Sequence, residues 1–131
     1  MIQRGLLLFA HGARDARWAL PFEDVAARVR GAAPAVALEL AYLEFMSPGL
    51  LEAGARLAAR GCTQVDVVPL FLGAGGHVRK DVPELLARLQ QAHADVAWRL
   101  QPAIGEAGPV LQAMADVALA RLAAADDAAM K

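Results

Sequence analysis

A chain of 131 residues with 57% apolar and 21% charged side chains has the size and composition of one compact domain, which excludes a largely disordered protein. Thirteen basic and fourteen acidic side chains give a net charge of -1, which argues against a nucleic-acid partner held by phosphate neutralisation. The single cysteine, Cys62, excludes an internal disulfide.

No apolar run approaches the roughly 20 residues of a membrane span, so no membrane partner is expected. Residues 1–12 also lack the hydrophobic length and the cleavage site of a signal peptide. The sequence therefore predicts a cytoplasmic location.

The N-terminal half predicts two strands, each followed by a helix. Residues 4–11 (RGLLLFAH) are almost continuously apolar, which is typical of a strand covered on both faces. Bulky apolar side chains at helical spacing predict a helix over residues 18–30. Residues 35–44 alternate large with small or polar side chains, as in a half-covered edge strand. Ser47 and Pro48 then predict the N-cap and the first residue of a second helix.

The C-terminal half repeats this order. Residues 64–72 (QVDVVPLFL) predict a second central strand, and Asp81 and Glu84 have capping-box spacing at the start of a third helix. Residues 95–101 predict the other edge strand, and Pro109 opens a last helix. The side chains of that helix expected to face inward are Val110, Met114 and Val117.

Alternation of strands and helices with short connections predicts an α/β fold with right-handed crossovers. With the first and third strands central, the four-stranded parallel sheet has the order 2-1-3-4. The predicted architecture is a single-domain, flavodoxin-like three-layer sandwich over residues 1–122. Residues 123–131, rich in alanine and aspartate, are expected to form a frayed C-terminal tail.

Ligands of open parallel sheets bind beyond the carboxyl ends of the strands at the topological switch point, here between the first and third strands. His11 ends the first predicted strand, Glu44 ends the second and His77 follows the third. Two imidazoles and a carboxylate suit a first-row divalent metal ion and acid–base work. Glu44 has an alternative role as a cap for the helix near Ser47. His93 falls at the end of the third helix, where a structural role is expected.

A glycine-rich stretch precedes His77, and it lacks the Lys-Ser/Thr pair of a phosphate-binding loop. We interpret Gly75 and Gly76 as residues that let the backbone lie close to a large flat ligand. Basic side chains on the same rim favour a small anionic ligand, although each has ordinary surface charge as its alternative. They are Arg14, Arg17, Arg79 and Lys80.

Four motifs occur in order along the chain, namely His11-Gly12-Ala13-Arg14-Asp15, Tyr42-Leu43-Glu44 with Pro48 after it, Val68-Pro69-Leu70-Phe71-Leu72 running into Gly75-Gly76-His77, and Asp81-Val82-Pro83. Together they resemble the small CbiX-type sirohydrochlorin chelatases, the class II tetrapyrrole chelatases, from residue 5 to about residue 111. The chain departs from that pattern at Ala13, where serine is usual, and after the fourth strand, where residues 104–109 (IGEAGP) lack the histidine of many members.

The resemblance implies a lyase that inserts cobalt(II), iron(II) or nickel(II) into sirohydrochlorin, in cobalamin or siroheme biosynthesis, without an organic cofactor. It implies that His11, Glu44 and His77 handle the metal, which is a substrate. The basic rim and Gly75-Gly76 would then hold the tetrapyrrole and its carboxylates. Because double-length members contain two such domains, a homodimer is expected.

Two other function classes remain open at this point. One is a carrier or sensor of metal or tetrapyrrole that uses the same ligands without catalysis. The other is a metal-dependent hydrolase, for which the rim offers no candidate serine or cysteine nucleophile, since Ser47 is better explained as a helix cap.

Overall fold

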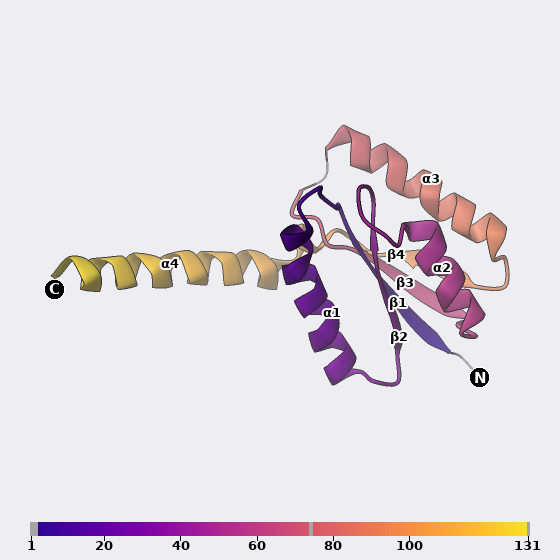
Figure 1. Ribbon diagram of the computed structural model, residues 1–131, viewed down its shortest axis with the longest axis horizontal. Helices are drawn as coiled ribbons and strands as arrows, with labels where there is room; N and C mark the ends of the chain where they lie inside the picture. The colour runs from indigo at the N-terminus through magenta and orange to yellow at the C-terminus, as the bar shows by residue number, and fades with distance from the viewer. Residues whose placement is uncertain (1–2, 74, 131) are drawn as a thin grey trace.

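The computed structural model describes residues 3–73 and 75–130, and at the start of α3 it describes only the backbone of residues 76–78. Strands and helices alternate along the chain, with two short 3-10 helices, η1 and η2 (Figure 1). In chain order the elements are β1 (Arg4–Ala10), η1 (Ala16–Ala19), α1 (Leu20–Ala32), β2 (Ala37–Tyr42), α2 (Leu50–Ala59), β3 (Gln64–Pro69), α3 (Gly76–Ala92), β4 (Ala97–Leu100), η2 (Ile104–Glu106) and α4 (Gly108–Met130).

The four strands form one parallel sheet with the order β2-β1-β3-β4, so the predicted fold class and strand order are confirmed. In the register of the central strands, Leu8 lies between Leu40 of β2 and Val68 of β3. Helices α2 and α3 cover one face of the sheet and α1 packs on the other. The continuously apolar sequence of β1 follows from this burial on two sides, whereas β3 is fully covered on one face only: Val65 and Val67 are buried, and Gln64, Asp66 and Val68 on the other face are half-buried.

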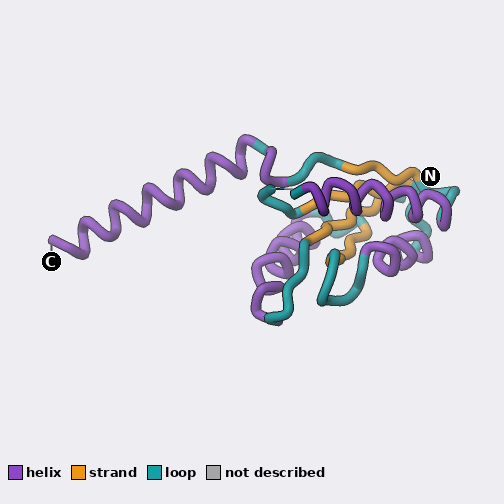
Figure 2. Tube along the Cα trace, turned by 90° about the horizontal axis from the view of Figure 1, so that it is seen from above, coloured by secondary structure: helices purple, strands orange, loops and turns teal. Residues whose placement is uncertain are grey.

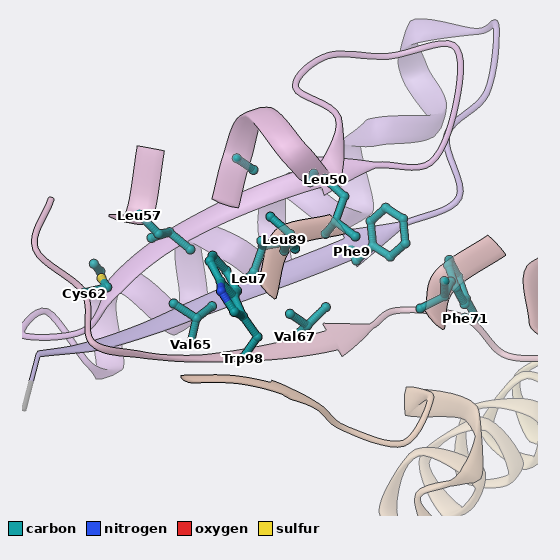
Figure 3. Packing of buried hydrophobic residues seen from close by; sticks show 14 residues of the cluster. Leu7, Phe9, Leu50, Leu57, Cys62, Val65, Val67, Phe71, Leu89 and Trp98 are labelled. Carbon is teal, nitrogen blue, oxygen red and sulfur yellow. The ribbon is translucent and has the colours of Figure 1, made fainter. Parts of the chain in front are cut away.

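The main core lies between the sheet and helices α2 and α3 (Figure 3). Because successive side chains of a strand point to opposite faces, Leu7 and Phe9 enter this core while Leu8 packs toward Ala26 of α1. Trp98 of β4 is part of this core, and its indole N–H donates to the carbonyl of His93 at 3.2 Å. Each large side chain buried here stabilises the fold by roughly 1.5–3 kcal/mol.

The predicted start of the second helix at Ser47 and Pro48 is wrong. Helix α2 begins at Leu50, with Gly49 in the N-cap position, and the peptide bond between Ser47 and Pro48 is cis. The reason is that this segment still pairs with β2. Tyr42 donates its N–H to the carbonyl of Pro48 at 2.9 Å, so the chain turns into a helix only after that contact.

The predicted capping box of the third helix is also wrong. Helix α3 begins at Gly76, five residues before Asp81, with Gly75 as its N-cap in an extended conformation. The Arg79 N–H donates to the carbonyl of Gly75 at 3.1 Å, so the backbone closes the first turn without a side-chain cap. Asp81 and Glu84 lie inside the helix.

Helix α4 differs most from the prediction, because it projects away from the body of the domain (Figures 1 and 2). Its expected inward side chains do not face the core: Val110 is half-buried, and Met114 and Val117 are each 50% exposed. Residues 123–130 continue the helix, and their fraying stays a prediction for solution experiments. Within the described residues, no helix has the length and apolar character needed to cross a membrane.

Candidate functional site

His11 and Glu44 meet at the carboxyl end of the sheet because β1 and β2 keep pairing past their last strand residues. The Leu43 N–H donates to the carbonyl of Ala10 at 2.9 Å, and the Glu44 N–H donates to the carbonyl of His11 at 3.1 Å. This pairing brings His11 Nδ1 to 3.6 Å from Glu44 Oε1, with the two side chains 43% and 41% exposed. Two of the three predicted metal-handling residues therefore lie side by side and open to solvent.

Gly12 makes this approach possible. Its φ of +91° is a conformation that L side chains rarely adopt. A Cβ atom at this position would collide with the backbone carbonyl of Glu44. The His11-Gly12 sequence thus places an imidazole at the strand end and then lets the backbone of the neighbouring loop pass directly against it.

The separation of His11 and Glu44 suits a shared ligand better than a bond between them. At 3.6 Å the contact is too long for a good hydrogen bond. Within the described residues, His11 Nδ1 has one further polar contact, with the carbonyl of Gly12 at 3.4 Å. Both contacts are longer than a good hydrogen bond, so one imidazole nitrogen and one carboxylate oxygen can bind the same divalent ion or exchange protons with a ligand.

One aromatic ring lies against His11, and a second aromatic residue follows Glu44 in the sequence. Phe71 is buried and lies edge-on to the His11 ring, with centroids 6.2 Å apart. Phe45 follows Glu44 in an exposed turn with φ of 65°, and the Arg14 guanidinium lies over its ring at 4.6 Å. Such a cation–π contact holds the arginine near the rim. Sequence reasoning did not single out Phe45, although an aromatic residue next to a candidate ligand was an available signal.

A groove of about 380 Å³ lies at the carboxyl ends of β3 and β4, and neither His11 nor Glu44 lines it. Phe71 links the groove to the pair, since it lines the groove and contacts His11. Leu72 lies at its edge and is 64% exposed. Two charged side chains, Arg79 and Glu106, complete an otherwise mainly apolar lining. The groove therefore offers an apolar surface with one positive and one negative side chain.

The third predicted ligand, His77, is the second residue of α3, and its side chain lies outside what the structure describes. Among the side chains that the structure describes, no group of three or more histidine, cysteine and acidic residues is placed to hold a metal ion. At Gly75 nothing described lies within 4 Å of where a Cβ would stand. The part of the chain that the structure describes therefore leaves the space beside this glycine open.

The predicted basic residues differ in their surroundings. Arg17 donates to both carboxylate oxygens of Asp15, at 3.3 and 3.0 Å, and this hydrogen bonding lowers the pKa of Asp15. Arg17 is thus largely offset by its neighbour. Arg14 and Arg79 border the site through Phe45 and the groove, and Lys80 is exposed in the first turns of α3.

Residues 104–109 follow β4 and lack the histidine that many CbiX-type chelatases have there. Their first part forms the 3-10 helix η2. Gly105 donates its N–H to the carbonyl of Phe71 at 2.9 Å, and its Cα lies so close to the backbone of Leu72 that no side chain fits. His93 is the C-cap of α3, with its N–H donating to the Leu89 carbonyl at 2.9 Å. Both segments therefore have structural roles.

Comparison with known proteins gives a consistent picture. The family model of CbiX matches residues 5–123. A sirohydrochlorin cobaltochelatase of Sulfurisphaera tokodaii is 32% identical over 88 residues, covering 66% of this chain and 70% of that protein. One from Saccharolobus solfataricus is 36% identical over 85 residues, covering 63% of this chain and 62% of the relative.

Solved structures agree with these sequence matches. A CbiX protein of Marinobacter aquaeolei VT8, linked to cobalamin (vitamin B12) biosynthesis, is 39% identical with a TM-score of 0.81, covering 91% of this chain and 97% of that one. The sirohydrochlorin chelatase SirB of Bacillus subtilis subspecies spizizenii, in complex with cobalt, has a TM-score of 0.77 at 23% identity. There the match covers 86% of this chain and 48% of SirB, and at that identity it supports the fold alone.

Proposed function

The chain belongs to the CbiX family, and on that premise we propose that it is a sirohydrochlorin metallochelatase, a lyase that inserts a divalent metal ion into the macrocycle. The candidate metals are cobalt(II), iron(II) and nickel(II). The product would serve cobalamin or siroheme biosynthesis. No organic cofactor takes part in the proposed reaction, and the metal is a substrate.

The observation that carries the proposal is the pair of His11 Nδ1 and Glu44 Oε1, 3.6 Å apart at the switch point and linked by Phe71 to an open apolar groove. An imidazole and a carboxylate are ligands that first-row divalent ions accept while keeping part of their water shell. His77 is proposed as the third metal-handling residue. The groove gives the face of the macrocycle an apolar surface next to these ligands.

Insertion needs a partly dehydrated metal ion and the loss of two pyrrole protons. Two pyrrole N–H bonds break, the metal binds the ring nitrogens, and two protons leave with no change in oxidation state. An imidazole has an ordinary pKa near 6.5, so it can ligate the incoming ion or accept a proton near pH 7. In the proposal His11 and His77 do this work, and Glu44 supplies an oxygen ligand and offsets the charge of the ion.

The rim is proposed to hold the substrate. Arg14 and Arg79 border the site and bind carboxylates at the edge of the macrocycle, with Arg17 and Lys80 adding positive charge. Gly75 and Gly76 leave the backbone open to a flat ligand. The working unit is proposed to be a homodimer. Its proposed location is the cytoplasm, where thiols stay reduced, and the unpaired, buried Cys62 is consistent with that.

A catalytic turnover experiment tests the proposal. The full chain is incubated anaerobically at one hundredth of the sirohydrochlorin concentration with each metal in turn, and insertion is followed by the absorption change. We expect many equivalents of product per chain, formed faster than in the same mixture without protein. A burst limited to about one equivalent per chain would identify a carrier or sensor, and no acceleration with any of the metals would refute the chelatase.

A further inference from the structure

Phe45 is an aromatic residue held in solvent beside the candidate site. It is 57% exposed, although burial of a phenyl ring is among the strongly favourable terms of folding. It directly follows Glu44, so the two Cα atoms are one peptide unit, about 3.8 Å, apart. The exposure of this ring next to a candidate metal ligand is not explained by packing of the domain.

The backbone at Phe45 has a conformation that bulky residues rarely adopt. Its φ is 65°, and the Met46 N–H donates across it to the Glu44 carbonyl at 2.8 Å. A hydrogen bond between residues two positions apart, with a positive φ at the central residue, forms a strained γ-turn. Glycine would adopt this turn without the steric cost. Phenylalanine at this position therefore lowers the stability of the fold, as strained residues of functional sites do.

The strained turn directs the ring away from an apolar cluster that the next residue joins. Met46 packs against the cluster around Tyr42, together with Trp18 and Phe22. Phe45 belongs to none of the hydrophobic clusters formed by the residues that the structure describes. Apolar cover is thus available one residue away, and the turn keeps the Phe45 ring outside it.

Arg14, in the loop after β1, contacts the exposed ring. Its guanidinium carbon lies 4.6 Å from the centroid of the Phe45 ring. The nearest carboxylate in the sequence, Asp15, pairs instead with Arg17 at 3.0 Å. A cation–π contact positions a guanidinium without using its N–H groups, which can still donate to a carboxylate. Phe45 and Arg14 therefore present an aromatic surface and a carboxylate donor at the same place.

A conjugated macrocycle with carboxylates at its edge matches both groups. In the proposed reaction the metal enters the centre of the ring, so this centre lies at the pair of His11 and Glu44. The macrocycle then extends outward from the pair over the residues that adjoin it, and Phe45 adjoins Glu44. Aromatic rings prefer offset-stacked or edge-to-face contacts, so a phenyl ring at this position both holds a pyrrole unit and orients the macrocycle.

We propose that Phe45 is a substrate-binding residue, whose ring packs on the macrocycle and positions Arg14 to bind a carboxylate at its edge. The inference rests on the proposed function and adds a binding residue to it. The contact is present before and during metal insertion, so it should act on substrate affinity and hardly on the turnover number. The strained turn adds a second expectation, that Phe45 strengthens binding and weakens the fold.

Equilibrium binding of metal-free sirohydrochlorin to the full chain, followed by its absorption change, tests the role of the ring. Phe45→Leu keeps the apolar character without the ring, and it should weaken binding at least about tenfold. In the insertion assay the same variant should raise KM with little change in kcat. Phe45→Trp retains an aromatic ring and should bind within about threefold of wild type. Val25→Ala is the matched control, because Val25 is an exposed apolar residue on α1, and it should bind as wild type does.

Urea denaturation tests the strain separately. Phe45→Gly relieves the positive φ, so it should raise the urea midpoint while it binds sirohydrochlorin no better than Phe45→Leu. A lower midpoint for Phe45→Gly would make Phe45 a structural residue and overturn the proposal, as would a Phe45→Leu variant that binds as tightly as Val25→Ala. A wild type that binds sirohydrochlorin and inserts no metal would refute the chelatase, and the binding comparison would still decide the role of Phe45. A wild type without affinity for sirohydrochlorin would overturn both.

Discussion

Replacing Gly12 by alanine should damage the fold and the site together, because this glycine lets the two strand ends approach. The φ of +91° is unfavourable for alanine, at a cost of roughly 1–2 kcal/mol. The new Cβ would also meet the Glu44 carbonyl. Relief requires the Glu44 backbone to move, which strains the hydrogen bonds that Leu43 and Glu44 donate across the loop, each worth about 0.5–1.5 kcal/mol.

Together these effects predict a loss of about 2–4 kcal/mol in the free energy of unfolding, measured by urea denaturation. A domain with a typical free energy of unfolding of about 5–15 kcal/mol would remain folded after this loss. The displaced Glu44 should slow metal insertion by at least about tenfold, since misplacement by an ångström is costly in catalysis.

Gly31→Ala is the matched control. Gly31 lies near the end of α1 with nothing within 4 Å of a Cβ, so alanine there should leave insertion unchanged and add up to about 1 kcal/mol of stability. The reasoning is refuted if Gly12→Ala is as stable and as active as Gly31→Ala.

Two further predictions concern charge. Arg14→Gln and Arg79→Gln should each raise the KM for sirohydrochlorin several-fold with little change in kcat, and added salt should affect them less than wild type; an unchanged KM in both would leave them as surface charge. Hydrogen bonds from Arg99 lower the pKa of Asp66, so Asp66 stabilises the fold above its unfolded pKa near 3.9 and loses this as pH falls through its folded pKa. Asp66→Asn should thus lower the urea midpoint more at pH 7 than at pH 3; an equal loss at both would contradict it.

The sheet and half of the site could be predicted because they depend on local patterns and one topological rule. Apolar runs through β1 and β3 are typical of central strands, and that order alone places the carboxyl ends of β1 and β2 together. The proximity of His11 and Glu44 follows from this order, although they are 33 positions apart in sequence.

Other features depended on tertiary contacts that no pattern reports. Helix α2 begins at Leu50 and not at the predicted Ser47, because the Pro48 carbonyl accepts a hydrogen bond from Tyr42 across the loop. The left-handed turn at Phe45 places an aromatic ring under Arg14, and neither residue has a periodic signal. The apolar pattern of α4 predicts a helix packed on the sheet, whereas the helix projects from the domain with none of its described residues buried.

The most direct test of the central claim is the initial rate of cobalt(II) insertion into sirohydrochlorin by wild type, His11→Ala and His77→Ala under anaerobic conditions. The account predicts at least about a 100-fold loss in each variant, the scale of a lost acid–base or metal-positioning group, with folding unchanged by circular dichroism. His93→Ala is the matched control, because that histidine caps α3, and it should retain insertion. If folded His11→Ala and His77→Ala insert cobalt as fast as His93→Ala, the assigned site is wrong.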